Sequence, residues 1–146
     1  MRLERILVPV DFSEFSREAM KAAVDLVKQS GGELRLVNAF QLPAFAYGEG
    51  AFGLPEALAR LRRSSEMGLS DWAEEAKALG AKRVSAVAVD GVAWDIVCRL
   101  AADERSDLIV MGTHGRTGLR HALLGSVAEK VVRHAPCTVL IVRPRA

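Results

Sequence analysis

The chain has 146 residues, 50% of them hydrophobic and 26% charged, which is enough for one domain, spanning residues 1–146, with a core of its own. The formal net charge is only +2 at pH 7, and the basic clusters at residues 60–63 and 143–145 are interpreted as a solvated helix face and a tail, which argues against a nucleic-acid partner. No apolar stretch approaches the length of a membrane span, and residues 1–10 lack the apolar core of a signal peptide, so we expect a cytoplasmic protein without a membrane partner.

The first forty residues predict a strand, a helix and a second strand. Residues 5–10, RILVPV, form a short apolar run that is typical of a buried strand. Ser13 is placed to cap the helix that follows, and Gly31 and Gly32 are placed to end it. Residues 34–39 predict the second strand. Because a helix joins the two strands, we expect them to pair in parallel through a right-handed crossover.

Residues 40–55, FQLPAFAYGEGAFGLP, predict a loop, since they hold three glycines, two prolines and four of the eight aromatic residues. A lid or contact surface is one interpretation, and a surface loop whose aromatic side chains pack onto the domain is the favoured one. Pro55 then stands where a helix can begin, and a helical pattern continues to Gly80. Gly68 weakens its middle by ~1 kcal/mol relative to alanine, so a bend or break there is an open alternative.

The remaining elements alternate in the same way. The sequence predicts strands at residues 84–89, 108–111 and 138–142, and helices at residues 94–102 and 126–134. Five strands alternating with four helices are typical of an α/β fold, a doubly wound parallel sheet with helices on both faces. The alternation alone does not fix the order of the strands.

The two cysteines, Cys98 and Cys137, lie in apolar surroundings without a C-x-x-C motif or clustered histidines. We therefore expect buried free thiols rather than a disulfide or a zinc site.

The most informative stretch follows the fourth predicted strand. Gly112 ends that strand, Gly115 follows, and nine residues later Gly125 and Ser126 open a helical pattern, which gives the arrangement G-x2-G-x9-G-S. Glycines allow bare backbone N–H groups to approach an anion, and a helix N-terminus adds the positive end of its dipole. The spacing therefore predicts phosphate binding, although it is not a P-loop, because Gly-Lys-Ser/Thr occurs nowhere in the chain.

A structural alternative stays open for the same residues. Gly112 would then only end a strand, and Ser126 with Glu129 would form an S-x-x-E capping box.

Two segments of the chain closely resemble the universal stress protein family. They are GTHGRTGLRHALLGSVAEKVVRHAPCTVLIVR, residues 112–143, and RILVPVDFS, residues 5–13. The ATP-binding branch of that family is marked by this glycine-serine spacing, so the resemblance implies ATP binding. It also implies the strand order 3-2-1-4-5, and a homodimer in which the edge strand Thr138–Val142 pairs antiparallel with its copy.

In the implied strand order, Asp11 and Gly112 follow two neighbouring strands at the topological switch point, where open α/β sheets bind ligands. The resemblance implies that Asp11 contacts the nucleoside, the alternative being a helix-entry residue, and that the main chain of Ala39 meets adenine. Arg116 is placed to pair with phosphate, the open alternative being a solvated side chain. The predicted nucleotide-binding residues are Asp11, Ala39, Gly112, Thr113, Gly115, Arg116, Gly125, Ser126 and Val127.

The sequence offers no set of residues that predicts catalysis: no base, nucleophile or metal-holding carboxylate pair has a recognisable spacing. The pyrophosphatase loop of adenine-nucleotide hydrolases is also absent, because Asp11-Phe-Ser stands in its place. We expect ATP, or ADP or AMP, with Mg²⁺ or Mn²⁺ carried on the phosphates and hydrolysis slow at most. The leading hypothesis is a nucleotide-dependent regulatory protein of the stress response, and the alternative is an ATP-independent interaction module of the same fold.

Overall fold

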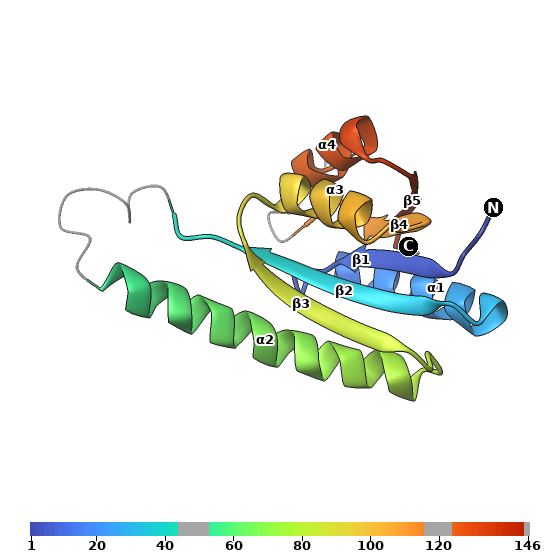
Figure 1. Cartoon of the computed structure of the whole chain (residues 1–146), viewed down its shortest axis with the longest axis horizontal. Helices are drawn as coiled ribbons and strands as arrows, with labels where there is room; N and C mark the ends of the chain where they lie inside the picture. The colour runs from blue at the N-terminus through green and yellow to red at the C-terminus, as the bar shows by residue number, and fades with distance from the viewer. Residues whose placement is uncertain (44–52, 116–123, 145–146) are drawn as a thin grey trace.

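One parallel sheet with helices on both faces forms the framework of the computed structural model, which describes residues 1–43, 53–115 and 124–144 (Figure 1). The strands lie in the order β3-β2-β1-β4-β5, so the predicted fold class and the implied order are both confirmed. The elements are β1 (Arg5–Pro9), α1 (Glu14–Ser30), β2 (Glu33–Phe40), α2 (Leu54–Ala78), β3 (Val84–Asp90), α3 (Ala93–Asp103), β4 (Leu108–Gly112), α4 (Ser126–His134) and β5 (Thr138–Val142). Residues 44–52 of the predicted loop lie outside the described residues, and its two ends belong to β2 and α2.

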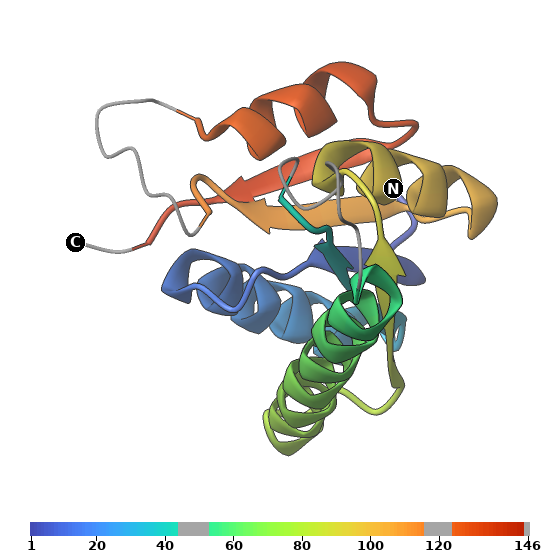
Figure 2. The same ribbon diagram turned by 90° about the vertical axis from the view of Figure 1, so that its left-hand side faces the viewer.

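The helices form two layers, with α1 and α2 on one face of the sheet and α3 and α4 on the other (Figure 2). Successive side chains of a strand alternate between these faces, as strand geometry requires. Ile6 and Val8 of β1 join the core under α1 and α2, whereas Leu7 between them joins the core under α3 and α4. Burial on both faces explains why the inner strands read as continuous apolar runs.

Helix α1 begins and ends where its sequence predicts. Ser13 is the N-cap, and its Oγ accepts a hydrogen bond from the backbone N–H of Ser16 at 3.2 Å. Gly31 at the other end has a φ of 75°, the left-handed conformation that glycine adopts without strain, and its N–H donates to the Val27 carbonyl. These caps fix where the chain leaves β1 and enters β2.

Helix α2 is one continuous helix of 25 residues, so Gly68 neither breaks it nor ends it. The glycine has a packing reason instead: a Cβ at this position would lie 2.7 Å from Cζ of Phe12. Phe12 has a φ of 65°, a left-handed conformation that costs a non-glycine residue roughly 1–3 kcal/mol. The close contact therefore ties α2 to the residue that follows Asp11.

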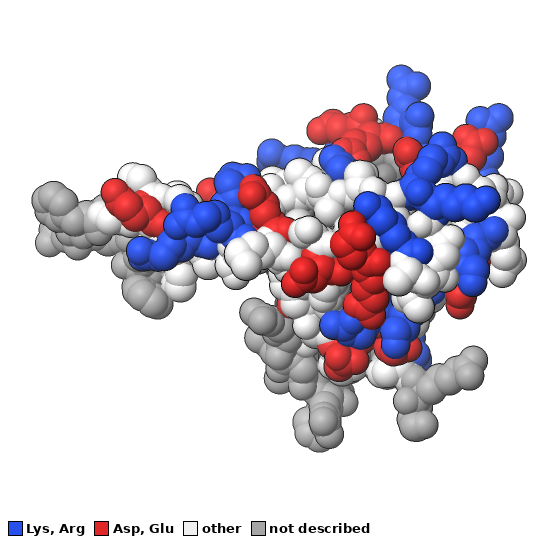
Figure 3. All heavy atoms as spheres, turned by 90° about the horizontal axis from the view of Figure 1, so that it is seen from below, with Lys and Arg blue, Asp and Glu red and all other residues white. Residues whose placement is uncertain are grey.

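The basic cluster on α2 is more than a solvated face. Arg62 places its guanidinium 5.2 Å from the centre of the Phe40 ring, and its Nη1 donates to the Ala88 carbonyl at 3.3 Å. Acidic and basic side chains are interspersed over the face of the molecule that Figure 3 shows.

Both cysteines are free, as predicted, but they are half-buried rather than buried. Each packs at the edge of the core under α3 and α4. Burial raises the pKa of the Cys98 and Cys137 thiols.

Among the helices of the described residues, none has the length and apolar character needed to cross a membrane.

Candidate functional site

A cleft of roughly 210 Å³ opens at the carboxyl ends of β1 and β4, the point where the strand order reverses. Helix α1, which follows β1, lies on one face of the sheet, and helix α4, which follows β4, lies on the other (Figure 2). Eight of the nine residues predicted to bind nucleotide line it, namely Asp11, Ala39, Gly112, Thr113, Gly115, Gly125, Ser126 and Val127. The ninth, Arg116, lies outside the described residues.

Two helices begin at this cleft without a side-chain cap. Ala93 at the start of α3 and Ser126 at the start of α4 both line it, and the N-caps Val92 and Gly125 make no side-chain capping hydrogen bond. The first N–H groups of a helix have no partner within the helix, and they carry its positive partial charge. The cleft is therefore electrostatically suited to an anion.

The capping-box interpretation of Ser126 is wrong. Gly125 is the N-cap of α4 and Ser126 is the first helical residue, one position too late to cap the helix. Glu129, the expected partner, forms an ion pair with Arg133 at 2.8 Å. The Ser126 side chain therefore stands at the cleft without the structural role that the alternative assigned to it.

The three glycines of the motif lie in close contacts within the protein, and a Cβ on Gly125 would lie 3.3 Å from the Thr113 carbonyl oxygen. A Cβ on Gly112 would lie 2.8 Å from the Phe15 carbonyl oxygen of α1, and a Cβ on Gly115 would lie 2.6 Å from Oδ2 of Asp11. Gly125 donates to the Thr113 carbonyl at 2.6 Å, which brings the start of α4 against the end of β4. None of the three has a left-handed backbone, so close approach, rather than an unusual conformation, explains them.

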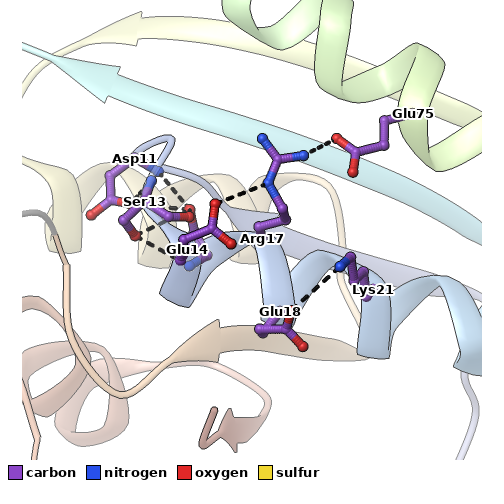
Figure 4. Close-up of polar contacts among 8 residues, drawn as sticks. Asp11, Ser13, Glu14, Arg17, Glu18, Lys21 and Glu75 are labelled. Carbon is purple, nitrogen blue, oxygen red and sulfur yellow. Dashed lines mark hydrogen bonds and ion pairs between the residues drawn. The ribbon is translucent and has the colours of Figure 1, made fainter. Parts of the chain in front are cut away.

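Asp11 serves the helix entry and also faces the glycine loop. Its Oδ1 accepts the Ser13 N–H at 3.0 Å and lies 3.0 Å from the Ser16 hydroxyl (Figure 4). Its Oδ2 is the atom that a side chain at Gly115 would meet. The helix-entry interpretation is thus confirmed for one oxygen, while the carboxylate as a whole lines the cleft.

Asn38 is a site residue that the sequence interpretation missed. It is 9% exposed, its Nδ2 donates to the Val10 carbonyl at 2.7 Å, and its Oδ1 accepts from the Ser65 hydroxyl at 2.6 Å. The signal was an asparagine directly after the apolar pair Leu36 and Val37, since an amide buried in a strand requires hydrogen-bond partners. Asn38 and Ala39 line the cleft together with apolar residues of the sheet, among them Pro9, Val37 and Met111.

His114 also belongs to this part of the structure, although it is not among the residues predicted to bind nucleotide. The structure places it half-buried in the lining of the cleft. Its ring lies 5.5 Å from the ring of Phe15, and its Nδ1 lies 3.1 Å from Oγ1 of the buried Thr113.

The part of the chain that the structure describes holds no group of three or more histidine, cysteine, aspartate or glutamate residues that could bind a metal ion. The described lining combines apolar sheet residues, the carboxylate of Asp11, the hydroxyls of Ser16 and Ser126, and the N–H groups of two helix starts. Such a surface suits a ligand with a flat apolar part and an anionic part.

Comparison with known proteins extends the likeness over nearly the whole chain. A model of the universal stress protein family matches residues 2–143. The universal stress protein MJ0531 of Methanocaldococcus jannaschii is 34% identical over 142 residues, which cover 96% of this chain and 82% of that protein. The solved structure of hypothetical protein MJ0577 aligns with a TM-score of 0.88 at 27% identity, covering 100% of this chain and 99% of that one. A universal stress protein in complex with cAMP aligns with a TM-score of 0.69 at 26% identity, covering 99% of this chain and 100% of that one.

Proposed function

The chain belongs to the universal stress protein family, and on that premise we propose that it binds ATP, or ADP or AMP, in the cleft between β1 and β4. One observation carries the proposal: eight residues predicted from the sequence line a single cleft onto which two uncapped helices open. The relative in complex with cAMP supports an adenine nucleotide as the ligand class. The bound nucleotide acts as a regulatory signal in the stress response.

The ligand would lie across the cleft with its nucleoside and phosphates at different ends. Asp11 and the main chain of Ala39 hold the nucleoside, whose apolar base faces the sheet residues of the lining. The N–H groups of Ser126 and Val127, together with the Ser126 hydroxyl, hold the phosphates at the start of α4. Arg116, outside the described residues, is proposed to pair with them.

Hydrolysis, where it occurs at all, is proposed to be slow. Phosphoryl transfer requires a positioned base or water and metal ions that neutralise developing charge. The described lining supplies one carboxylate, Asp11, and its Oδ1 is engaged at the entry to α1. We propose that Mg²⁺ or Mn²⁺ arrives bound to the phosphates.

Calorimetry with ATP, ADP and AMP tests the proposal directly, and mass spectrometry of ligand released from the purified protein tests it independently. We expect saturable binding or a retained adenine nucleotide. An empty protein that gives no binding with any of the three would support the ATP-independent interaction module instead.

We further propose that the protein is a homodimer that works in the cytoplasm. β5 lies at the edge of the sheet and pairs with β4 alone among the described strands, and Leu140 in its middle is 39% exposed. Its unpaired N–H and C=O groups can pair with a second copy. The two free thiols favour a reducing compartment.

A further inference from the structure

Helix α2 lies outside the cleft but acts on both neighbours of Asp11 in the chain: it contacts Phe12 directly and reaches Val10 through Asn38 of β2. We propose that α2 holds Asp11 in position for the nucleoside, with Ser65 and Gly68 as its positioning residues. The inference rests on the proposed function for its ligand and goes beyond it in assigning the helix a role.

The first contact runs through buried hydrogen bonds. Ser65 of α2 is 4% exposed, and its hydroxyl donates to Oδ1 of Asn38 at 2.6 Å. That bond orients the amide so that Nδ2 of Asn38 donates to the Val10 carbonyl at 2.7 Å. The peptide that joins Val10 to Asp11 is therefore fixed by a side chain of α2 acting through β2.

The second contact holds the residue on the other side of Asp11. The far edge of the Phe12 ring rests on Gly68, where a Cβ would lie 2.7 Å from Cζ and 2.8 Å from Cε1. The ring also meets Trp72, one turn further along α2, edge to face at 5.4 Å. Contacts on two sides thus maintain the left-handed backbone of Phe12, whose φ is 65°.

A third set of contacts, made by Arg17, holds α2 against α1. Arg17 of α1 lies 4.6 Å above the Trp72 ring and forms ion pairs with Glu75 of α2 and with Glu14 (Figure 4). Its hydrogen bond to Glu75 raises the pKa of the Arg17 guanidinium, which therefore stays charged. The helix that carries Ser65 and Gly68 is thereby fastened to the helix that follows Asp11.

The contacts described above fix the chain on both sides of Asp11. The Asp11 carboxylate itself packs closely against Gly115, where a Cβ would lie 2.6 Å from Oδ2. A small shift of the chain at Asp11 therefore changes how the carboxylate meets a ligand. Positioning of this kind acts on the nucleoside end of the cleft. Disturbing it should therefore weaken the affinity for ATP and the affinity for AMP by the same factor.

The test compares Ser65→Ala and Gly68→Ala with Ser64→Ala, a matched change at an exposed neighbour on the same helix. We expect both positioning variants to weaken ATP and AMP equally, by roughly tenfold, and Ser64→Ala to bind as the parent does. In a Phe12→Leu background, which lacks the far edge of the ring, adding Gly68→Ala should change the affinity very little. Thermal melts check that each variant is folded. Because the two variants act through separate contacts, a variant that fails to fold leaves the other to decide.

A second measurement separates this inference from the proposed function. In the nucleotide-free protein, Ser65→Ala and Gly68→Ala should shift the backbone amide NMR signals of Asp11 and Ser13, whereas Ser64→Ala should not. Unchanged amide signals, or unchanged nucleotide affinity in both folded variants, would overturn the inference. If the parent protein binds neither ATP nor AMP, the proposed function fails, and the amide signals still decide whether α2 positions Asp11.

Discussion

At the scale of single residues, Asp11 divides its two carboxylate oxygens between structure and cleft. Oδ1 holds the first turn of α1 through Ser13 and Ser16, and Oδ2 lies against Gly115. The two interpretations of Asp11 from the sequence, a helix-entry residue and a nucleoside contact, are therefore compatible. Substitutions at this position should reveal both roles.

We expect Asp11→Ala to weaken ATP and AMP by similar factors, roughly tenfold to a hundredfold, since a charge-assisted hydrogen bond contributes ~1.5–3 kcal/mol. It should also lower the melting temperature, because Ser13 loses its acceptor. Asp11→Asn keeps that acceptor and removes the charge, so it should restore stability more than affinity. Calorimetry and thermal melts on the two variants check both expectations, and equal affinity in parent and Asp11→Ala would confine the residue to the helix entry.

The two thiols give a prediction about pH. Burial raises the pKa of Cys98 and of Cys137, so at a given pH each holds less thiolate than in the unfolded chain. Alkylation should therefore be several-fold slower in the native protein than in urea at neutral pH, and the ratio should shrink as the pH rises. By linkage, the free energy of unfolding should decline above the ordinary thiol pKa, since the unfolded thiols lose their protons first. Equal alkylation rates in the two states would contradict the prediction.

At the scale of elements, the sequence predicted α4 and β5 to the residue, because short apolar runs and a glycine boundary mark them locally. It could not predict why Gly68 interrupts a good helical pattern, since the reason is Phe12, 56 positions away in the chain. The same limit explains the error at Ser126. An S-x-x-E spacing describes a capping box only if the serine is the N-cap, and packing of Gly125 against Thr113 sets the start of α4 one residue earlier.

The glycine loop yields a prediction that differs from a plain phosphate cradle. Gly115→Ala would place its Cβ 2.6 Å from Oδ2 of Asp11, so it should displace the carboxylate as well as narrow the loop. We expect AMP to lose affinity nearly as much as ATP does. Calorimetry with both nucleotides decides, and a loss restricted to ATP and ADP would show that Gly115 meets the phosphates and not Asp11.

Ser126→Ala separates ligand binding from helix capping. Gly125 is the N-cap of α4 and no side-chain bond caps the helix, so removing the Ser126 hydroxyl should leave the melting temperature almost unchanged. Loss of a genuine N-cap would instead cost ~1 kcal/mol. On the proposed function, ATP and ADP should bind several-fold more weakly, and AMP should be affected less. A variant with a lowered melting temperature and the ATP affinity of the parent would show that Ser126 caps the helix and does not bind phosphate.

At the scale of the whole molecule, the alternation of strands and helices predicted a doubly wound sheet, but the strand order came from the family resemblance, because alternation fits more than one order. The order matters because it places β1 beside β4 and leaves β5 at an edge. β4 is buried through Met111, whereas β5 is half-buried or exposed along its length. One topology thus sets both the ligand cleft and the surface proposed for self-association.

Pairing through β5 should be sensitive to charge in the middle of the strand. Leu140→Lys places an ammonium group where two copies would align, and both charges would lose water on pairing, so we expect the mass from light scattering to fall from dimer to monomer at micromolar concentration. Met67→Lys is the matched control, because Met67 is an exposed apolar residue of α2, on the other side of the strand order from β5. It should leave the mass unchanged. A parent protein that is already monomeric at that concentration would contradict the homodimer and leave the β5 edge solvent-exposed in solution.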